Sequence, residues 1–316
     1  MKVTGKVIVS DPIDPTGVAI LERAGLTVDY YPEIDSTELF SKVKDYDVII
    51  VRSRTRINRE VIEAAVKAKI IARVGVGLDN IDVKSAEDKG IRVINSSEAA
   101  INAVAELALG CMISLARSIT HADKELKNGK WIKKDLIGTE LRGKYIGLIG
   151  VGNIGRNLGR LARGLRMNVL GYDIYPIDAD YVREVGLIKT DLKTLVESAD
   201  FISCHVPLTS QTKHMLGAEL FAKMKPTTYV VNTSRGAVID ENALYDALKT
   251  HKIAGAALDV FEIEPPVNKK LIDLPNLICT PHIGSQTKES QELAATVIAE
   301  KVIQIIHELQ LDLGNT

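Results

Sequence analysis

The hydrophobic residues of the chain fall into short runs, separated by stretches in which apolar positions recur with helical spacing. In the first hundred residues, four runs rich in Val and Ile predict strands, namely Lys6–Val9, Val48–Val51, Ile70–Val74 and Ile91–Ile94. The intervening stretches predict the helices Thr16–Ala24, Asn58–Ala68 and Asp82–Lys89, with Gly25 and Gly90 as C-terminal stops. This alternation favours a parallel sheet covered by helices on both faces.

A second alternation of strands and helices begins near Lys144. Its apolar runs predict six strands, namely Tyr145–Ile149, Val169–Tyr172, Phe201–Cys204, Tyr229–Asn232, Gly255–Leu258 and Leu277–Cys279. Six such strands are enough for a complete dinucleotide-binding fold. A final helical stretch, Lys288–Leu309, follows them, and we expect it to pack back on the N-terminal domain.

A long helical stretch, Glu98–Asn128, and a polar connection around Trp131–Arg142 separate the two alternations. At 316 residues, the chain exceeds the size at which a single hydrophobic core usually stops growing. We therefore expect an α/β protein with two doubly wound parallel-sheet domains.

Composition and charge indicate an ordinary globular protein. The sequence is 46% hydrophobic, and its 40 Lys and Arg against 41 Asp and Glu give a formal charge of -1. This balance offers no general attraction to nucleic acid or to an anionic membrane. The three cysteines, Cys111, Cys204 and Cys279, lie far apart and lack metal-ligand spacing, so we expect no metal site and a reducing, cytoplasmic location.

The apolar stretches of the sequence predict neither a targeting segment nor a membrane-spanning helix. The start of the chain, Met1–Ser10, has no long apolar run and no small-residue cleavage site. The longest apolar tract, Ala99–Ala116, is interrupted by Asn102 and Glu106. We therefore expect no transmembrane helix.

A glycine-rich segment follows the strand that ends at Ile149. Gly150 permits a tight turn, Gly152 lets the backbone approach a pyrophosphate, and Gly155 allows close packing of helix on strand. The N-terminus of the following helix adds N–H groups and a positive dipole. A simple tight turn is the alternative interpretation, but the strand and helix on either side favour a dinucleotide site.

An acidic residue, Asp173, follows the next strand, where a carboxylate can accept hydrogen bonds from both ribose hydroxyls. A carboxylate at this position repels a 2′-phosphate. No Lys or Arg lies between Asp173 and Pro176 to neutralise such a phosphate. The segment therefore favours NAD over NADP.

Three polar residues, Arg235, Glu264 and His282, follow the carboxyl ends of later strands, which is where open α/β sheets bind ligands. The Arg235 guanidinium can bind a carboxylate through two parallel hydrogen bonds. His282 can exchange a proton with a substrate oxygen, and a carboxylate from Glu264 beside it would stabilise the imidazolium. Surface ion pairs and a structural histidine remain the alternatives for each residue taken alone.

A second polar cluster, Arg52, Ser53 and Arg54, directly follows a strand of the N-terminal domain. Two guanidiniums suit a carboxylate or phosphate of the substrate, although a solvated Arg54 is an equal alternative. The glycine-containing loop Arg73–Asn80 can bring backbone N–H groups to the same anion, or it can be only a turn that ends a strand.

The ordered motifs of the chain resemble the D-isomer-specific 2-hydroxyacid dehydrogenases over essentially its whole length. They are V-R-S-R-T from Val51, R-V-G-V-G-L-D-N-I-D from Arg73, G-L-I-G-V-G-N-I-G from Gly147, V-N-T-S-R-G-A-V-I-D from Val231, A-A-L-D-V-F-E-I-E-P-P from Ala256 and T-P-H-I-G-S-Q-T from Thr280. The resemblance implies that Arg235, Glu264 and His282 are catalytic, with His282 as the proton donor in the reducing direction.

The resemblance also implies a Rossmann NAD-binding domain of residues 98–285 and a smaller flavodoxin-like substrate domain of residues 1–97 and 286–316. The cofactor contacts it implies are Val76, Gly150, Gly152, Asn153, Ile154, Gly155, Asp173, Val206, Thr233, Ser234, Arg235, Asp259, His282, Gly284 and Ser285. The substrate contacts we expect are Arg52, Ser53, Arg54, Val76, Gly77, Asn102, Arg235 and His282. No metal is expected.

Members of this family are usually homodimers, so the resemblance implies a homodimer with the arm Ala99–Arg142 in much of the contact. Trp131 lies in this arm, either as a partly buried anchor or as a contact with the partner. The sequence ends at Thr316, which we take to leave no room for a C-terminal regulatory domain.

Within the family, the resemblance is closest to the enzymes that oxidise D-3-phosphoglycerate at the start of serine biosynthesis. A glyoxylate or hydroxypyruvate reductase is the alternative with the same fold and the same Arg, Glu and His set. An NAD-sensing corepressor is the alternative outside the enzymes, and turnover of any 2-keto acid with NADH would separate it from them.

Overall fold

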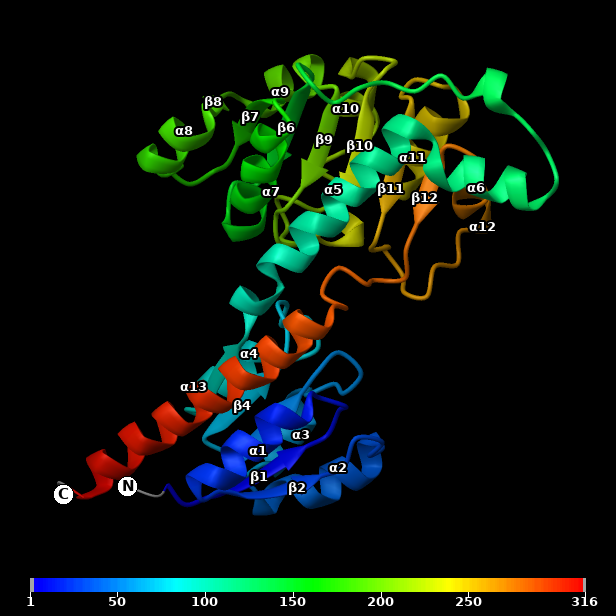
Figure 1. Cartoon of the computed structure of the whole chain (residues 1–316). Coiled ribbons are helices and arrows are strands. Elements are labelled where there is room, and N and C mark those ends of the chain that lie inside the picture. Colours follow the sequence, from blue (N-terminus) through cyan, green and yellow to red (C-terminus); the bar gives the residue numbers. More distant parts are fainter. Residues whose placement is uncertain (1–2, 315–316) are drawn as a thin grey trace. The chain divides into compact units, whose positions relative to one another are not determined.

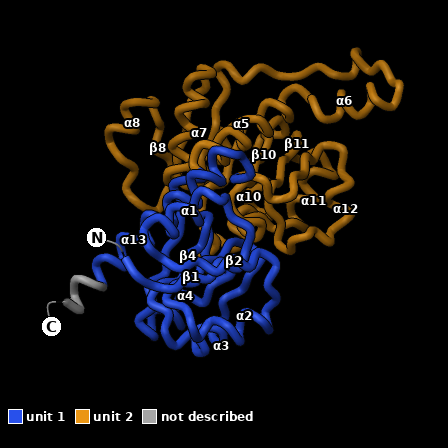
Figure 2. Tube along the Cα trace, turned by 60° about the horizontal axis from the view of Figure 1, so that its bottom comes forward, with its two compact units in different colours: residues 1–100, 285–316 blue, residues 101–284 orange. Residues whose placement is uncertain are grey.

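The computed structural model describes residues 3–314, which form two compact units. Unit 1 comprises residues 1–100 and 285–316, and unit 2 comprises residues 101–284 (Figure 2). The sequence placed the domain boundaries at 97/98 and 285/286, close to where the chain passes between the units.

In unit 1 the described strands form one parallel sheet in the order β2-β1-β3-β4-β5. This order is the flavodoxin-like one predicted for the smaller domain. The strands are β1 Lys6–Val9, β2 Thr27–Tyr30, β3 Val48–Val51, β4 Ile70–Arg73 and β5 Arg92–Asn95 (Figure 1).

Helices cover both faces of the unit 1 sheet because its central strands are apolar on both sides. One face packs α1 and α13 on Val7, Val9 and Ile50, and the other packs α2, α3 and α4 on Ile8 and Ile49. The helices are α1 Pro15–Ala24, α2 Ser36–Lys42, η1 Val43–Asp45, α3 Arg59–Ala64, α4 Val83–Asp88, η2 Ser97–Ala100 and α13 Lys288–Gly314. The prediction that the C-terminal helix packs on the N-terminal domain is confirmed by its contact with α1.

In unit 2 the described strands form one parallel sheet in the order β12-β11-β10-β9-β6-β7-β8, a Rossmann arrangement as predicted. The strands are β6 Tyr145–Ile149, β7 Asn168–Tyr172, β8 Ile188–Lys189, β9 Phe201–Cys204, β10 Tyr229–Asn232, β11 Gly255–Leu258 and β12 Leu277–Cys279. The strand order reverses between β6 and β9, and crevices at such points bind nucleotides.

Two apolar layers sandwich this sheet. The layer that contains Leu148 and Val231 packs against α5, α7 and α8, and the layer that contains Ile202 and Val230 packs against α9, α10 and α11. The helices are α5 Ile101–Arg117, α6 Ile119–Lys127, η3 Lys133–Asp135, α7 Asn153–Gly164, α8 Ala179–Val185, α9 Leu192–Ser198, α10 Ala218–Lys223, η4 Gly236–Val238, α11 Glu241–Lys249 and α12 Lys269–Ile272.

The sequence provided no bounds for the helices α8 to α12 of unit 2. It missed β2, α2 and β8, and it joined two helices into one. Both missed strands lie at sheet edges, where one side of the strand faces solvent and no continuous apolar run is needed. The predicted helix Glu98–Asn128 is wrong as a single element. It is broken at Ser118, whose φ of 52° ends α5 before α6 begins.

The segment Ser97–Arg117 is long and apolar enough to cross a membrane by length and composition, with a mean hydropathy of 1.8. More than half of this segment is buried inside the protein, where α5 packs on α7, β10 and β11. Core helices of globular proteins meet the same criteria, so the apolar character of α5 is explained by its place in the core.

Candidate active site

The glycine loop connects β6 to α7 at the crevice of the unit 2 sheet. Gly150 has a φ of 92°, which other residues rarely adopt, and its N–H donates to the carbonyl of Tyr172 at 2.9 Å. A Cβ on Gly155 would lie 2.2 Å from the Gly150 oxygen, whereas a Cβ on Gly152 would meet no atom within 4 Å. The loop is therefore tight at its ends and open in the middle, which suits the approach of a pyrophosphate.

Asp173 follows β7 and contacts the glycine loop directly. Its Oδ2 accepts the N–H of Val151 at 2.7 Å, and its Oδ1 accepts the N–H of Tyr175 at 2.9 Å. Each carboxylate oxygen keeps a free lone pair for a further hydrogen bond. The position fits a ribose contact, and the same carboxylate also fixes the loop beside it.

Two buried polar atoms at the carboxyl edge of the unit 2 sheet, where the glycine loop also lies, have no hydrogen-bond partner within residues 3–314. They are Nε2 of His205, after β9, and Oγ1 of Thr233, after β10. Burial lowers the pKa of His205 to about 4, so its imidazole is neutral at physiological pH. Unsatisfied buried polar atoms are costly, and a bound dinucleotide would supply the missing partners. The residues present therefore fit this cofactor.

His282 and Glu264 form the predicted pair. Nδ1 of His282 lies 2.7 Å from Oε2 of Glu264, and both side chains are partly open to solvent. The other carboxylate oxygen of Glu264 accepts the N–H of Phe261 at 3.1 Å. Because a carboxylate only accepts, Nδ1 carries the proton of this bond, and Nε2 of His282 is the atom left for proton exchange.

Asp259, at the end of β11, fixes the loop that carries His282. Its Oδ1 accepts the hydroxyl of Thr280 at 2.6 Å and the N–H of Ile283 at 2.8 Å, and its Oδ2 accepts the N–H of Gly284 at 2.8 Å. His282 itself has a φ of 53°, a conformation that costs energy unless its surroundings impose it. The buried carboxylate of Asp259 imposes it from both sides of the residue.

Arg235 lies in the loop after β10, directly beside β11 in the sheet. Asn232 donates its side-chain N–H to the carbonyl of Arg235 at 2.9 Å, and Arg235 Nη1 donates to the carbonyl of Ser234 at 2.7 Å. The following Gly236 packs so closely on Phe261 that a Cβ would lie 1.9 Å from its carbonyl carbon. Unit 2 thus presents Arg235 and the pair of His282 and Glu264 from neighbouring strand ends.

In unit 1, the two predicted anion-binding arginines have different surroundings. The guanidinium of Arg52 has no hydrogen-bond or ion-pair partner in the described part of the chain, and burial lowers its pKa while the charge of Asp11 opposes that change. The guanidinium of Arg54 donates to the carbonyls of Ile34, Ser10 and Pro32 and to the carboxylate of Asp11, which are its own chain. These contacts engage four of the five N–H groups of the Arg54 guanidinium, so Arg54 is bound mainly to its own chain, and its contact with substrate stays a prediction.

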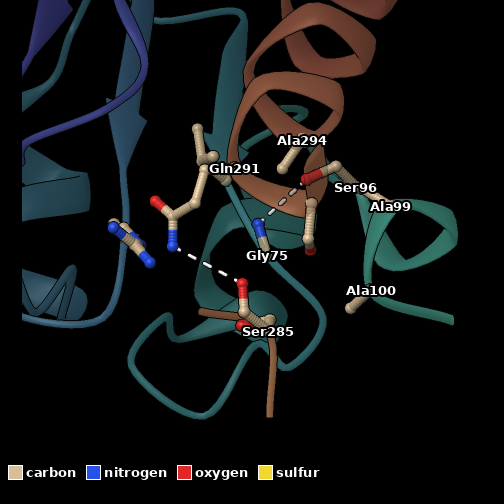
Figure 3. A pocket seen from close by; sticks show the side chains of 10 residues that line it. Gly75, Ser96, Ala99, Ala100, Ser285, Gln291 and Ala294 are labelled. Atoms are coloured by element: carbon tan, nitrogen blue, oxygen red, sulfur yellow. Dashed lines mark hydrogen bonds between the residues drawn. The ribbon is translucent and has the colours of Figure 1, made fainter. Parts of the chain in front are cut away.

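Arg52 lines a small cavity of unit 1 together with Gly75, Ser96, Ser285 and Gln291. Figure 3 shows the Gly75 N–H bound to the Ser96 hydroxyl, at 2.9 Å, on one side and the amide of Gln291 facing the Ser285 carbonyl on the other. The cavity volume is about 20 Å³, which is room for one water molecule.

Most of the remaining predicted residues lie in loops after strands, and the others lie at the start of α5 or of α7. Val76 and Gly77 follow β4, where the Val76 carbonyl accepts the amide of Asn95 at 2.6 Å. Asn102 is exposed on α5 and accepts the amide of Asn157 at 2.9 Å. The others are exposed Ser53 after β3, Asn153 and Ile154 at the start of α7, Val206 after β9, Ser234 after β10, and Gly284 and Ser285 after β12.

Three residues that the structure places beside these loops were missed by sequence reasoning. They are Asp11, Asn80 and His205, each of which follows a strand at the carboxyl edge of its sheet or lies in the loop beyond it. The rule that selected Arg52 and His282, a polar residue just after an apolar strand, applies equally to Asp11 and His205.

The part of the chain from residue 109 to residue 284 matches the family model of the D-isomer specific 2-hydroxyacid dehydrogenase, NAD binding domain. A D-3-phosphoglycerate dehydrogenase of Methanocaldococcus jannaschii is 45% identical over 95% of this chain and 57% of that protein. A hydroxypyruvate reductase of Thermotoga maritima is 43% identical over 95% of this chain and 97% of that protein. The chain thus spans little more than half the length of the first of these relatives.

Solved structures show the same fold. The TT0316 protein of Thermus thermophilus superposes with a TM-score of 0.87 at 31% identity, over 96% of this chain and 97% of that one. A glyoxylate reductase from Paecilomyes thermophila superposes with a TM-score of 0.88 at 29% identity, over 96% and 95% of the two chains.

Proposed function

Because this chain belongs to the D-isomer specific 2-hydroxyacid dehydrogenase family, whose NAD-binding domain it contains, we propose that it transfers a hydride between a small 2-hydroxy acid and NAD. The observation that carries the proposal is the 2.7 Å contact of His282 Nδ1 with Glu264, on a loop that Asp259 fixes beside Arg235. A base with one free nitrogen and a nearby guanidinium are what oxidation of a hydroxy acid requires from the protein.

NAD, when bound, supplies the hydride acceptor. The glycine loop, Asp173 and Thr233 would bind it. In oxidation, Nε2 of His282 removes the hydroxyl proton of the substrate, and Glu264 stabilises the imidazolium that results. Arg235 binds the carboxylate of the substrate and orients the carbon from which the hydride leaves.

The substrate we propose is D-3-phosphoglycerate, oxidised to 3-phosphohydroxypyruvate as the first step of serine biosynthesis. Relatives named D-3-phosphoglycerate dehydrogenase, 41 to 45% identical, support this choice. The Arg52 guanidinium, without a partner in residues 3–314, supports a second negative group on the substrate.

Reduction of hydroxypyruvate or glyoxylate is the second candidate. It is favoured by the hydroxypyruvate reductase of Thermotoga maritima, of whose length the chain covers 97%. The same His282, Glu264 and Arg235 serve both reactions, run in opposite directions.

We further propose that the protein is a cytoplasmic homodimer. The arm that joins α5 to β6 exposes four large apolar side chains, with Trp131 80% and Ile137 93% exposed, and Ile119 and Leu126 about half. The alternative of Trp131 as a partly buried anchor within its own chain is thereby corrected. Exposed apolar side chains gathered on one arm are typical of a surface that a second subunit covers.

A panel of substrates tests the proposal. The purified protein is assayed with D-3-phosphoglycerate, glycerate, lactate, glyoxylate and hydroxypyruvate, each with NAD(H) and with NADP(H). We expect the highest kcat/KM with D-3-phosphoglycerate and NAD, and a hydroxypyruvate rate above it would transfer the assignment to the second candidate. Absence of turnover with every acid would overturn the enzymatic function and favour an NAD-binding regulator.

A further inference from the structure

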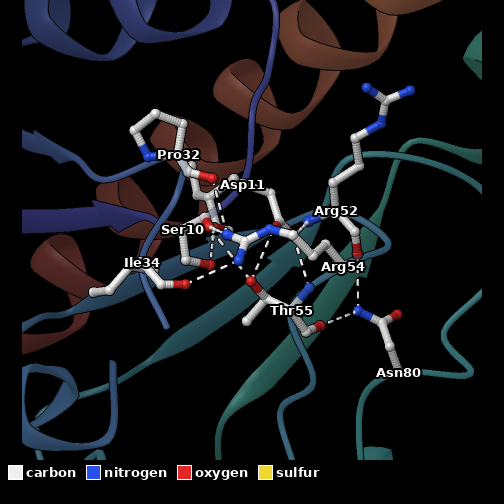
Figure 4. Close-up of polar contacts among 9 residues, drawn as sticks. Ser10, Asp11, Pro32, Ile34, Arg52, Arg54, Thr55 and Asn80 are labelled. Atoms are coloured by element: carbon white, nitrogen blue, oxygen red, sulfur yellow. Dashed lines mark hydrogen bonds and ion pairs between the residues drawn. The ribbon is translucent and has the colours of Figure 1, made fainter. Parts of the chain in front are cut away.

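The segment of residues 52–55, here called the 52–55 loop, is fixed by hydrogen bonds from two sides (Figure 4). We propose that Asp11 and Asn80 are the positioning residues for Arg52, and that through Arg52 they set the affinity of the protein for its anionic substrate. The inference rests on the proposed function, in which Arg52 contacts the substrate.

Asp11 binds the N–H side of the 52–55 loop. It follows β1, the strand next to β3, and it is fully buried. Its Oδ2 accepts the N–H of Arg52 at 2.5 Å and of Thr55 at 3.2 Å, and its Oδ1 accepts the Thr55 hydroxyl at 2.8 Å. A buried carboxylate is stable only with such donors around it, so the loop has one favourable arrangement around Asp11.

Arg54 compensates the charge of this buried carboxylate. Its Nε lies 3.1 Å from Oδ1 of Asp11, and its other nitrogens donate to the carbonyls of Ser10, Pro32 and Ile34. The ion pair therefore connects the 52–55 loop to the ends of β1 and β2. Arg54 is part of the support of the loop.

Asn80 binds the carbonyl side of the same loop. Its Nδ2 donates to the carbonyl of Arg52 at 2.8 Å and to that of Thr55 at 2.6 Å. Asn80 lies in the loop after β4, so the strand ends on both sides of β3 contact the 52–55 loop. With both the N–H and the carbonyl of Arg52 bound, the backbone of that residue has little freedom.

Within residues 3–314, no hydrogen bond or ion pair involves the side chain of Arg52. Figure 4 shows its guanidinium extending away from the contacts that fix its backbone. An arginine loses much side-chain entropy when it orders around a ligand, and a fixed backbone reduces what remains to be lost. Asp11 and Asn80 should therefore act on substrate affinity and leave the chemical step unchanged.

The experiment is a double-mutant cycle on KM, with D-3-phosphoglycerate and NAD in one direction and hydroxypyruvate and NADH in the other. Arg52→Gln should raise KM roughly 30- to 100-fold, and Asp11→Asn roughly 5- to 20-fold, each with kcat within about twofold. The double variant should match Arg52→Gln within about twofold, because Asp11 acts through Arg52. Effects of the two changes that multiply in the double variant would overturn the proposal.

The matched control is Asp47→Asn. Asp47 accepts the N–H of Lys6 at 2.7 Å, so it joins the same two strands, β1 and β3, at their other ends. The KM of Asp47→Asn should stay within about twofold of the wild-type KM. If Asp47→Asn raised KM as much as Asp11→Asn does, the effect of Asp11→Asn would reflect general stability. NADH binding, measured by fluorescence, should be unchanged in every variant.

A second variant, Asn80→Ala, keeps the proposal testable if Asp11→Asn does not fold. It removes both donors to the 52–55 loop and should raise KM several-fold with kcat retained. An unchanged KM for Asn80→Ala would refute the positioning role, provided that Arg52→Gln raises KM. If Arg52→Gln itself leaves KM unchanged, the substrate contact in the proposed function fails, and the positioning role fails with it.

Discussion

Asp259 in unit 2 and Asp11 in unit 1 occupy equivalent places in two different sheets. Each is a buried aspartate at the carboxyl end of a strand, and each accepts N–H groups from the loop after the neighbouring strand. Asp11 also contacts the guanidinium of Arg54, whereas the Thr280 hydroxyl and the N–H groups of Ile283 and Gly284 that bind Asp259 are neutral donors. In the proposed function they differ also in what they position, which is the proton-transfer residue His282 for Asp259 and the anion-binding residue Arg52 for Asp11.

The comparison teaches that one structural device serves two kinetic roles. A buried carboxylate that fixes a loop affects the step, either substrate binding or proton transfer, in which the residue on that loop takes part. We therefore expect damage to the unit 2 loop to appear in kcat and damage to the unit 1 loop to appear in KM.

The largest effect is expected at the residue that the unit 2 loop carries. His282→Ala removes the only base in the proposed mechanism and should lower kcat by roughly 10² to 10⁴. Steady-state rates together with NADH binding measure it, and the NADH affinity should change little. A kcat of His282→Ala near that of the wild type would show that this loop does not carry the proton-transfer residue.

The next effect tests the support of that loop. Asp259→Asn replaces an acceptor with a donor where three donors already point, so the loop should lose at least one hydrogen bond and His282 its fixed backbone. We expect kcat to fall roughly 10- to 100-fold, with KM for the acid within about threefold. Asp11→Asn should instead raise KM and leave kcat nearly unchanged. If both variants changed kcat and KM in the same way, the two loops would not have separate kinetic roles.

A third strand-end carboxylate, Asp173, sharpens the comparison because the proposed function assigns it to the cofactor. Asp173→Ser removes the acid that repels a 2′-phosphate, and it removes the bond to Val151. The preference for NAD over NADP, measured as a ratio of kcat/KM values, should narrow by roughly tenfold. A wild-type protein that used both cofactors equally would contradict the role assigned to Asp173.

The smallest effect concerns His205, a strand-end residue whose buried side chain is a base. Its pKa of about 4 lies below the ordinary value of 6.5, so near pH 5.5 the unfolded chain binds a proton that the folded chain does not. The contribution of neutral His205 to the free energy of unfolding is fully present above about pH 6.5. It is lost as the pH falls toward 4, because protonation then favours the unfolded chain. The free energy of unfolding, measured with denaturant, should fall between pH 7.5 and pH 5.5. This fall should be about 1 kcal/mol larger in the wild type than in His205→Gln.

The sequence predicted the central strands of both sheets and the contact between His282 and Glu264, because strand ends are readable from apolar runs. It gave solvation as the alternative for Arg54 and did not predict that Arg54 would bind to its own chain. Arg52 and Arg54 are only two residues apart and look alike in sequence. The carbonyls of Pro32 and Ile34, which accept hydrogen bonds from Arg54, come from a part of the chain about 20 residues earlier. Edge elements such as β2 and β8 were missed for the related reason that their burial depends on neighbours.

The packing of α13 on α1 has a consequence for the order in which the two units fold during translation. Gly17 of α1 approaches α13 so closely that a Cβ would lie 2.9 Å from Ala295, and Ile298 and Val302 complete the apolar layer that contains Val7. β1 thus waits for α13, which is synthesised after residues 101–284, and those residues already hold every strand of the unit 2 sheet. Unit 2 is therefore able to fold before unit 1 is complete during translation.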